Sequence, residues 1–343
     1  MKIHRILVLL TSLALVLAAC SPSTTKVEAT ATMLPEPAVA SVKPFRVAVI
    51  MPSAVNDLAF SQSMYDALNR IQEDMGGTEK MQYVYSQGMF ILDDAAAAIR
   101  TYASQDYDLV IAHGSQYGQA VKEIAPDFPA VSFVWTNATG PVNLPNVFEV
   151  VAAAHEGGYV NGVLAATLTT TKIISIIGPV ETGEPKQYIE GFKAGAISIN
   201  PEIQLNVTYI GSFSDVVKAS DAATNDISAG ADVMTGTSQM VVGPIGQANQ
   251  NNILWFGTQS NQSSLAPKIV VANQVYHWEV VLKELFAKEQ AGTIGGESFT
   301  INLANGGEVI EYNPGYALPA NAKALGDATI QGIIDGTIKI PLP

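Results

Sequence analysis

The chain has 343 residues, of which 48% are hydrophobic and 14% charged, and its formal net charge is −13. An acidic chain without a basic run argues against nucleic acid as a partner and against a surface that anionic lipids attract by charge. Its length is enough for two α/β domains of ordinary size.

The first 20 residues have the pattern of a secretory signal, with a basic start, an apolar core and small residues before Cys20. The ending Leu-Ala-Ala-Cys resembles the bacterial lipobox, in which the cysteine is lipidated and becomes the mature N-terminus. We therefore predict a lipoprotein signal peptide over residues 1–19 and a lipid anchor on Cys20; an ordinary signal peptide with an incidental cysteine is the alternative. Residues 20–43, rich in Ser, Thr, Pro and Ala, predict a flexible tether on the extracytoplasmic face of the cell membrane.

The folded body begins with a run of apolar and β-branched residues at 45–51, which predicts a buried parallel strand. A polar turn follows, and from Leu58 the apolar positions recur at helical spacing. Asp57 is a natural N-cap for this helix, because its carboxylate can accept hydrogen bonds from the first backbone N–H groups. A strand, a polar turn and a helix N-terminus also form the place where open α/β sheets bind ligands. Asp57 is therefore either a helix cap alone or part of a binding site.

Strand and helix patterns alternate along the rest of the chain. The predicted strands are 81–86, 107–112, 130–135, 147–151, 172–177, 203–210, 231–234, 253–257, 269–275 and part of 299–312; the predicted helices are 92–104, 117–124, 156–168, 188–197, 216–228, 278–288 and 322–335. This alternation indicates βαβ units and a parallel sheet, and its restart near residue 152 indicates two similar lobes.

The domain boundaries follow from that restart. We predict an N-terminal lobe over residues 44–151 with a return segment at about 270–300. The C-terminal lobe is predicted over residues 152–265, with part of 300–343.

The sequence lacks the commonest catalytic and metal-binding motifs. It has no HExxH, GxSxG or GxxxxGK[ST] motif, and SAVND stands where a dinucleotide-binding fold would carry GxGxxG after its first strand. None of the four histidines has a partner at metal-ligand spacing, and no spacing of carboxylates singles out an acid–base pair. We therefore predict no catalytic residues, no metal and no cofactor, which favours a binding protein over an enzyme.

Five short blocks occur in a fixed order within residues 45–280: NDLAFSQS at 56–63, HEGGYVNGVLAA at 155–166, GFKAGA at 191–196 with a following Asn-Pro, YIGSFSD at 209–215 and GADV at 230–233. Together they resemble the basic membrane protein family, whose best-known members are the PnrA-like purine nucleoside receptors of bacterial ABC importers. The resemblance implies a type I periplasmic-binding-protein fold of class α/β. In that fold two Rossmann-like lobes with parallel sheets are joined by a hinge and enclose the ligand between them.

The resemblance also places a ligand site at the first block. It implies that Phe60 stacks on a purine base and that Asp57, beside Asn56, bonds the edge of the base. Ser61 stands where the family usually has Asn, which leaves fewer contacts to the base. The alternative for Phe60 is that it is the first core residue of its helix.

Further candidate ligand contacts lie at other strand ends. Ser115 and Tyr117 follow the third predicted strand, and Trp135 ends the fourth; both aromatic residues could equally be wall packing. The second lobe has two glycine-bearing loops at strand ends. One is 236–240, which begins with Gly236, and the other is 180–186. These loops could close over the ligand, or their glycines could only make the turns.

The second lobe departs from the nucleoside receptors at two positions. Gln259 stands where the family has an Asp that binds ribose hydroxyls, and Tyr276 stands where it has a Lys, with Trp278 nearby. Charge-assisted hydrogen bonds are roughly twice as strong as neutral ones, so the loss of both charges favours a free base over a nucleoside. A slipped alignment in these loops is the alternative.

The sequence thus predicts a lipid-anchored substrate-binding protein of an ABC importer. It would bind a purine base or nucleoside without chemistry, pass it to a permease and have no nucleic-acid partner. Two alternatives stay open: a sensor of the same fold that signals to a membrane partner, and an α/β enzyme.

Overall fold

The computed structural model describes residues 43–341, and these belong to a single compact unit. The predicted signal peptide, Cys20 and all but the last residue of the predicted tether lie outside the described residues. Within the described range, no helix combines the length and the apolar character needed to span a bilayer.

The first sheet consists of six parallel strands in the order β11-β5-β4-β3-β1-β2. Its strands are β1 (Phe45–Ile50), β2 (Met81–Ser86), β3 (Leu109–His113), β4 (Ser132–Thr136), β5 (Val147–Ala152) and β11 (Ser298–Ile301). Every residue of β3 and β4 is buried, as expected for parallel strands that are covered on both faces.

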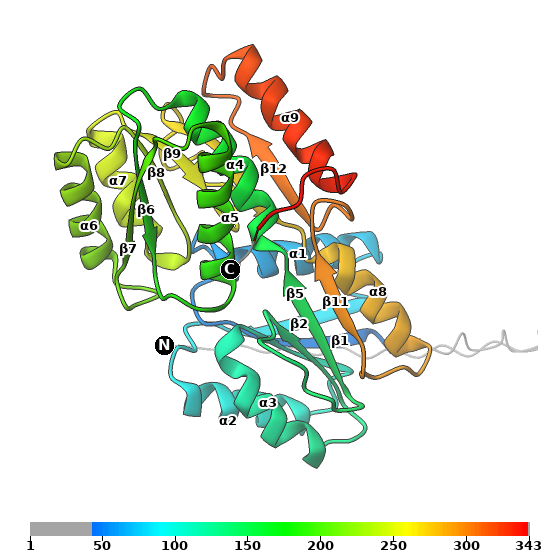
Figure 1. Cartoon of the computed structure of the whole chain (residues 1–343). Helices are drawn as coiled ribbons and strands as arrows, with labels where there is room; N and C mark the ends of the chain where they lie inside the picture. Colours follow the sequence, from blue (N-terminus) through cyan, green and yellow to red (C-terminus); the bar gives the residue numbers. More distant parts are fainter. Residues whose placement is uncertain (1–42, 342–343) are drawn as a thin grey trace, which may run out of the picture. The chain divides into compact units, whose positions relative to one another are not determined.

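Helices cover both faces of this sheet. Apolar side chains of α1 (Phe60–Asp74) and α8 (Glu279–Gln290) share one core with β1 and β3. Side chains of α2 (Leu92–Ala103) and α3 (Gly118–Ile124) form a second core against the other face, and Figure 1 shows these two helices side by side. Short 3₁₀ turns, Ser115–Tyr117 and Ala125–Asp127, flank α3.

The second sheet has the order β12-β10-β9-β8-β6-β7, and β12 alone runs antiparallel to its neighbour. Its strands are β6 (Ile173–Gly178), β7 (Gln204–Tyr209), β8 (Val233–Gly236), β9 (Leu254–Gly257), β10 (Val270–Tyr276) and β12 (Glu308–Tyr312). The helices are α4 (Ala154–Leu168) and α5 (Gly183–Ile199) on one face, and α6 (Val216–Ser228) and α7 (Val242–Gln250) on the other. A 3₁₀ turn, Gln239–Val241, precedes α7, and α9 (Ala320–Ile334) packs on α4. The predicted α/β architecture of two lobes with parallel sheets is confirmed.

Three segments connect the two lobes: β5 to α4, β10 to α8, and β11 to β12 (Figure 1). The predicted return segment at about 270–300 therefore differs from the structure in one respect. β10 pairs with β9 in the second sheet, so the residues that return to the first lobe are α8 and β11. Apolar strands that are buried on both faces look alike in either sheet, which is why the sequence pattern did not separate them.

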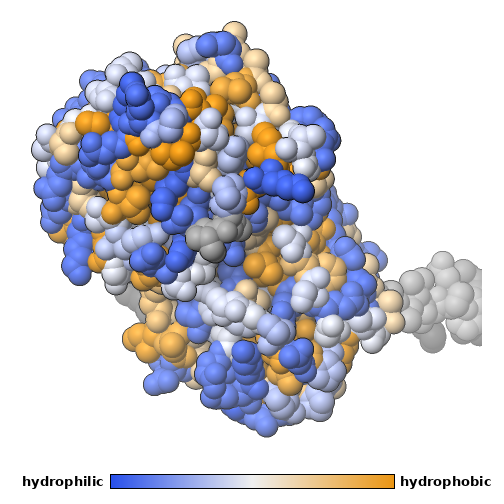
Figure 2. All heavy atoms as spheres, in the orientation of Figure 1, coloured by the Kyte–Doolittle hydropathy of each residue, from blue (hydrophilic) through white to orange (hydrophobic). Residues whose placement is uncertain are grey.

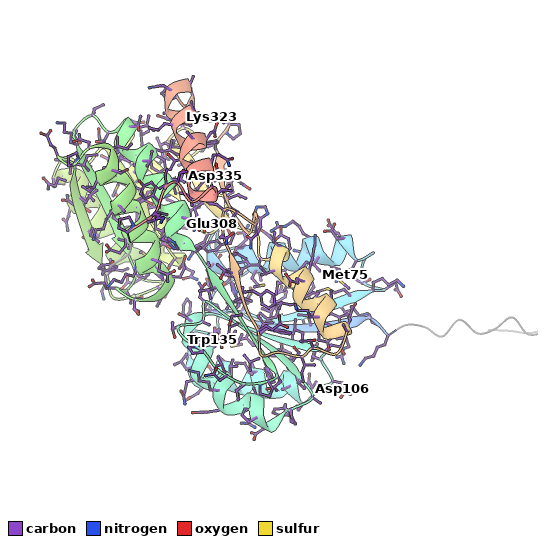
Figure 3. All side chains as sticks on the ribbon, turned by 45° about the vertical axis from the view of Figure 1, so that its right-hand side comes forward. Met75, Asp106, Trp135, Glu308, Lys323 and Asp335 are labelled. Carbon is purple, nitrogen blue, oxygen red and sulfur yellow. The ribbon has the colours of Figure 1, made fainter. Side chains whose placement is uncertain are left out.

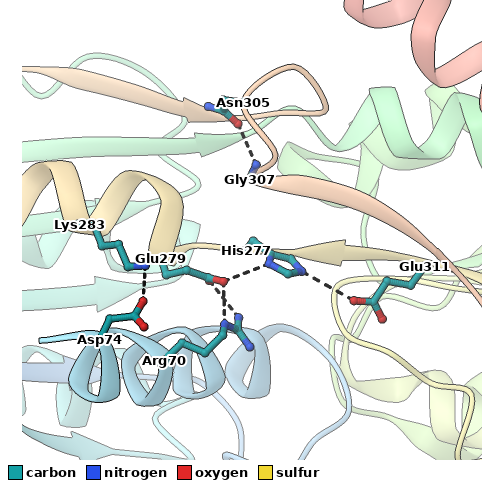
Figure 4. Close-up of polar contacts among 8 residues, drawn as sticks. All are labelled: Arg70, Asp74, His277, Glu279, Lys283, Asn305, Gly307 and Glu311. Carbon is teal, nitrogen blue, oxygen red and sulfur yellow. Dashed lines mark hydrogen bonds and ion pairs between the residues drawn. The ribbon is translucent and has the colours of Figure 1, made fainter. Parts of the chain in front are cut away.

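An ion-pair cluster joins α1 to α8 beside the second of these connections (Figure 4). Arg70 on α1 makes a bidentate pair with Glu279, at 2.7 and 2.9 Å. His277 lies 3.0 Å from Glu279 and 3.7 Å from Glu311 of β12. The Glu279 carboxylate, which accepts from the His277 ring, and then the Glu311 carboxylate raise the pKa of His277 to about 9.

Candidate functional site

A pocket lies where strand ends of the two lobes meet, and each lobe supplies six of its lining residues. The space free of protein atoms there is about 370 Å³, open solvent included. The lining consists of Pro52, Phe60, Phe90, Ser115, Gln116 and Asn137 from the first lobe and Glu184, Pro185, Phe213, Ser238, Gln239 and Gln259 from the second. Most of these residues follow the carboxyl ends of strands, where open α/β sheets bind ligands.

Phe60 begins α1 and lines the pocket, as predicted for a stacking residue, but its ring also belongs to an aromatic cluster. The ring stacks on the His113 imidazole at 3.8 Å with an interplanar angle of 10°, and its edge faces Trp278 at 5.9 Å. Burial lowers the pKa of His113 to about 3, so the imidazole is neutral. Its Nε2–H donates to the Phe60 carbonyl oxygen and its Nδ1 accepts from the Thr136 hydroxyl, both at 2.9 Å.

The other predicted residues of the first block lie outside the pocket lining. The Asp57 carboxylate accepts hydrogen bonds from the backbone N–H groups of Ala59, Ser61 and Gln62, at 2.9 to 3.1 Å. It thus caps the start of α1, although the helix begins at Phe60, two residues later than predicted, and has Ala59 at its N-cap position. Burial raises the pKa of Asp57, and these backbone donors oppose the rise. The Ser61 hydroxyl accepts from the backbone of Ser53, and Asn56 is exposed.

Ser115 lines the pocket, whereas the two aromatic residues predicted with it form the wall behind. The Tyr117 hydroxyl donates to the Met89 carbonyl oxygen at 2.8 Å, and Trp135 Nε1 donates to the Gly114 carbonyl oxygen at 3.0 Å. Both side chains are buried, and Figure 3 shows Trp135 within the first lobe. They correspond to the alternative of wall packing.

In the second lobe, Gln259 lines the pocket and Tyr276 lies behind it. The Tyr276 hydroxyl donates to Glu184, a pocket residue that sequence reasoning did not single out. Trp278 Nε1 donates to the Ser63 hydroxyl at 2.8 Å, away from the lining. Gly236 is buried at the end of β8, where an added Cβ would lie 2.8 Å from the Ile177 carbonyl oxygen, so its small size serves strand packing.

Glu184 is held in the first turn of α5, which begins at Gly183 and follows β6 and the loop 179–182. Its side chain is 7% exposed, and the Gln259 amide Nε2 donates to both carboxyl oxygens, at 3.3 and 3.2 Å. Burial raises the pKa of Glu184, while hydrogen bonds from Tyr276 and then Gln259 lower it. Glu184 could have been predicted from the same sequence pattern as Asp57, namely a strand, a polar turn and a carboxylate at the start of a helix.

Three lining residues have left-handed backbone conformations although they carry side chains. The φ angles of Asn137, Ser238 and Gln259 are 52°, 76° and 67°. Such conformations cost free energy and collect at functional sites, because they aim side chains that a relaxed strand end would not. These conformations could not be predicted from the sequence, since none of the three residues is a glycine.

Two buried amide oxygens at the pocket lack a hydrogen-bond partner within residues 43–341. They are Oε1 of Gln239 and Oε1 of Gln259. An unmet buried acceptor costs about 1–3 kcal/mol, so these atoms favour a ligand that brings N–H or O–H donors.

Aromatic rings reach the pocket from both lobes. Phe60 and Phe90 come from the first lobe and Phe213 from the second, and Phe90 is 40% exposed. Phe213 belongs to the block YIGSFSD, whose possible contact with a ligand the sequence analysis missed. In the part of the chain that the structure describes, no group of three or more His, Cys, Asp or Glu residues could hold a metal ion. The arrangement suits non-covalent binding of a flat molecule with polar edges.

On the face shown in Figure 2, hydrophobic and hydrophilic residues are mixed over both lobes. Single exposed apolar residues of this kind are normal on folded proteins. The pocket, rather than this face, is therefore the feature that distinguishes the molecule.

Comparison with known proteins gives consistent results. The family described as "ABC transporter substrate-binding protein PnrA-like" matches residues 45–341. The chain is 26% identical to a purine-binding protein of Brucella abortus, over 85% of this chain and 82% of the relative. It is also 26% identical to the ABC transporter nucleoside-binding protein BmpA of Lactococcus lactis, over 84% and 86%. The transcriptional activator protein med of Bacillus subtilis is 25% identical, over 76% and 80%.

Among solved structures, an ABC transporter solute-binding protein from Conexibacter woesei superimposes with a TM-score of 0.71. The sequence identity is 23%, and the match covers 86% of this chain and 98% of the other. This likeness supports the two-lobe fold derived above.

Proposed function

The chain belongs to the PnrA-like family of ABC transporter substrate-binding proteins, which are not catalysts, and we propose that its pocket binds a purine base or nucleoside. The ligand would enter between the lobes, be enclosed as the hinge closes and be released unchanged to a permease. Two of the relatives named above carry purine or nucleoside binding in their names, which supports this ligand class.

The observation that carries the proposal is the composition of the pocket lining. Three phenylalanine rings, contributed by both lobes, offer planes on which a flat heterocycle can stack. Amide and hydroxyl groups of Gln116, Asn137, Ser238 and two further glutamines supply polar contacts around those planes. Rings for the faces and a few polar groups for the edges are what recognition of a purine requires.

Between the two purine classes, the free base remains our preference. Gln259 and Tyr276 are uncharged at the positions where the nucleoside receptors carry an Asp and a Lys for the sugar. The lining nevertheless contains one ionisable side chain, because α5 brings the Glu184 carboxyl to Gln259 and Tyr276. In the nucleoside receptors that the chain resembles, a lysine binds the sugar together with the carboxylate. Glu184 has no such lysine beside it, because Tyr276 occupies that position.

We also propose a lipid anchor on Cys20 and a location on the extracytoplasmic face of the membrane. The support is the lipobox-like ending of the signal sequence. Radioactive palmitate fed to producing cells would label the wild type and not Cys20→Ser. Labelling of both, or of neither, would contradict the anchor.

A sensor of the same fold is the second candidate function, supported by the relative that is named a transcriptional activator. Deletion of the gene distinguishes the sensor from the transporter component. A transporter component is needed for uptake of labelled purine, whereas a sensor changes gene expression and leaves uptake intact.

Calorimetry of the purified protein tests the ligand class. The panel contains adenine, guanine, hypoxanthine, their nucleosides, sugars and amino acids. We expect a purine to bind and the sugars and amino acids to give no heat. Binding of a sugar or an amino acid with no response to any purine would overturn the proposal.

A further inference from the structure

Glu184 is the one ionisable side chain among the residues that line the pocket within the described range. Its carboxyl is nine-tenths buried, on the second lobe, at the first turn of α5. A buried carboxylate is costly unless donors surround it, so its position at a ligand pocket calls for a reason.

Two protein donors fix the orientation of this carboxyl. Tyr276 at the end of β10 donates its hydroxyl to Oε1, and the Gln259 amide, in the loop after β9, reaches both oxygens. A carboxylate offers about four acceptor positions. Two donors therefore leave it able to accept further hydrogen bonds from a bound molecule.

Two further acceptors belong to residues that line the same pocket. Gln259 Oε1 and Gln239 Oε1 are both buried and have no partner among the described residues. Together with the free positions on Glu184 they form a set of acceptors. Such a set selects a ligand edge that is rich in N–H groups.

We propose that Glu184 determines specificity by accepting two adjacent N–H groups from the ligand, as the ring N–H and the neighbouring amino group of a guanine-type base present them. This inference rests on the proposed function, since it assumes a purine-like ligand, and it narrows that ligand to the 2-amino-6-oxo class. The Phe60 and Phe213 rings would hold the faces of the base and Glu184 would read its edge.

The pairing follows from donor and acceptor chemistry. A carboxylate only accepts hydrogen bonds, and a guanine edge supplies two parallel donors to its two oxygens. Adenine presents a ring nitrogen acceptor beside its amino group, so its lone pair would face a carboxylate oxygen. Hypoxanthine has the ring N–H but lacks the amino group, so it can make one of the two bonds.

The bound ligand would also help to settle the charge on the carboxyl. Burial raises the pKa of Glu184, and the hydrogen bonds from Tyr276 and Gln259 oppose that rise. Two more donors from a guanine edge favour the ionised form in the same way.

Calorimetry with guanine, hypoxanthine and adenine, each as base and as nucleoside, tests the inference. For the wild type we expect the guanine compound to bind at least about tenfold more tightly than the adenine compound, the discrimination of a bidentate pair. Hypoxanthine compounds should fall between them. A wild-type preference for adenine would overturn the inference without any mutant.

Glu184→Gln is the matched substitution, because glutamine has the same shape but offers one acceptor and one donor. It should weaken guanine binding at least about tenfold and leave adenine binding unchanged or stronger, so that the preference reverses. The control is Glu181→Gln, in the same loop, whose carboxylate is exposed and outside the pocket lining; it should behave as the wild type.

Three outcomes are distinguishable. An unchanged guanine-to-adenine ratio in Glu184→Gln, or an equal loss for both compounds, contradicts the role of Glu184 and leaves purine binding intact. Failure of every purine to bind the wild type refutes the proposed function itself. Melting curves show whether a variant is folded. Tyr276→Phe supplies a second test: it removes only one donor to Glu184, so it should reduce the preference for guanine over adenine less than Glu184→Gln does.

Discussion

Phe60 has two environments at once, since its ring lines the pocket and also stacks on a neutral imidazole. His113 is buried and bonded at both nitrogens, so it presents a fixed, uncharged plane behind the phenyl ring. Trp278 closes the cluster edge-on. A ring supported in this way loses little freedom when a ligand stacks on it, which favours binding.

Phe60→Leu should therefore weaken purine binding by about 1–3 kcal/mol, because leucine fills similar space but offers no plane for stacking. Calorimetry measures the change. Phe299→Ala in β11, outside the pocket, is the control and should leave affinity unchanged. Equal affinity of Phe60→Leu and the wild type would remove Phe60 from the site.

The sequence could predict part of this pocket at the level of residues. Phe60, Ser115 and Gln259 were predicted and line it. Ser115 follows a strand end, which can be recognised along a chain, whereas Phe60 and Gln259 were indicated by the family resemblance. Glu184 was predicted only as part of the loop 180–186, although a carboxylate at a helix start is a local signal, and Phe213 was missed, since its approach to the pocket depends on contacts between elements that are far apart in sequence. Asp57 was ambiguous for a physical reason: the same carboxylate that suits a ligand also suits backbone donors.

At the scale of elements, α4 and α5 pack so closely that glycines form their contact. A Cβ on Gly162 of α4 would overlap the Phe192 carbonyl oxygen, and one on Gly195 of α5 would overlap the Tyr159 carbonyl oxygen. Both glycines belong to blocks that carry the family resemblance. Their role is packing between helices rather than contact with a ligand.

Gly162→Ala should lower the free energy of unfolding by about 1–3 kcal/mol, although alanine is the better helix former, because backbone atoms cannot move aside cheaply. Gly246→Ala is the matched control. Gly246 also lies inside a helix, α7, but a Cβ added there would meet no atom within 4 Å. The change should therefore raise the free energy of unfolding by about 0.5–1 kcal/mol. Urea unfolding measures both, and equal effects would contradict the packing argument.

The ion-pair cluster of Arg70, His277, Glu279 and Glu311 should make the free energy of unfolding depend on pH. The folded-state pKa of His277, about 9, lies above the ordinary histidine value of 6.5, so its contribution to the free energy of unfolding is complete below pH 6.5 and is lost as pH rises through 9. We expect the stability difference between wild type and His277→Gln to shrink over that interval. Partial exposure limits the effect to about 1 kcal/mol. Urea titrations at pH 6 and pH 10 measure it, and a constant difference would contradict it.

Elements were predicted well where apolar periodicity was strong and poorly where it was not. The alternation of strands and helices identified both lobes, because each element must bury one face. Helix α7 was missed, since its sequence VGPIGQANQ contains Pro244 and two glycines that usually interrupt helices. Pro244 is tolerated because it lies in the first turn, where backbone N–H groups have no partner within the helix.

At the scale of the whole molecule, two hydrogen bonds join the loop after β9 to the start of α1. The Ser260 hydroxyl donates to the Ala59 carbonyl oxygen at 2.7 Å, and the Gln262 amide donates to the Leu58 carbonyl oxygen at 3.1 Å. Opening of the hinge at this point would break both bonds. They therefore favour the arrangement in which lining residues of both lobes surround the pocket.

Ser260→Ala should speed ligand release, because it removes one bond made only while the lobes are together. A net hydrogen bond of about 0.5–1.5 kcal/mol corresponds to a rate increase of roughly 2- to 10-fold. Stopped-flow fluorescence measures the release rate. Ser228→Ala, an exposed serine on α6, is the control. No change in release rate would show that this bond does not hold the lobes.

The lobe to which each late segment belongs was the feature of the fold that the sequence predicted least well. β10 and β11 both follow the predicted second series, yet they belong to different sheets. Pairing between distant strands depends on three-dimensional packing, and no local pattern reports it.

The three connections between the lobes also bear on how the chain is made. Synthesis proceeds from the N-terminus, so β11 and β12, one edge strand of each sheet, emerge after all the other strands that the structure describes. Until then β5 and β10 each present an unpaired edge, which can bind other chains. Both sheets are therefore completed only after their other strands have been made, and a nascent chain that stalls before Ser298 would leave each sheet without one of its edge strands.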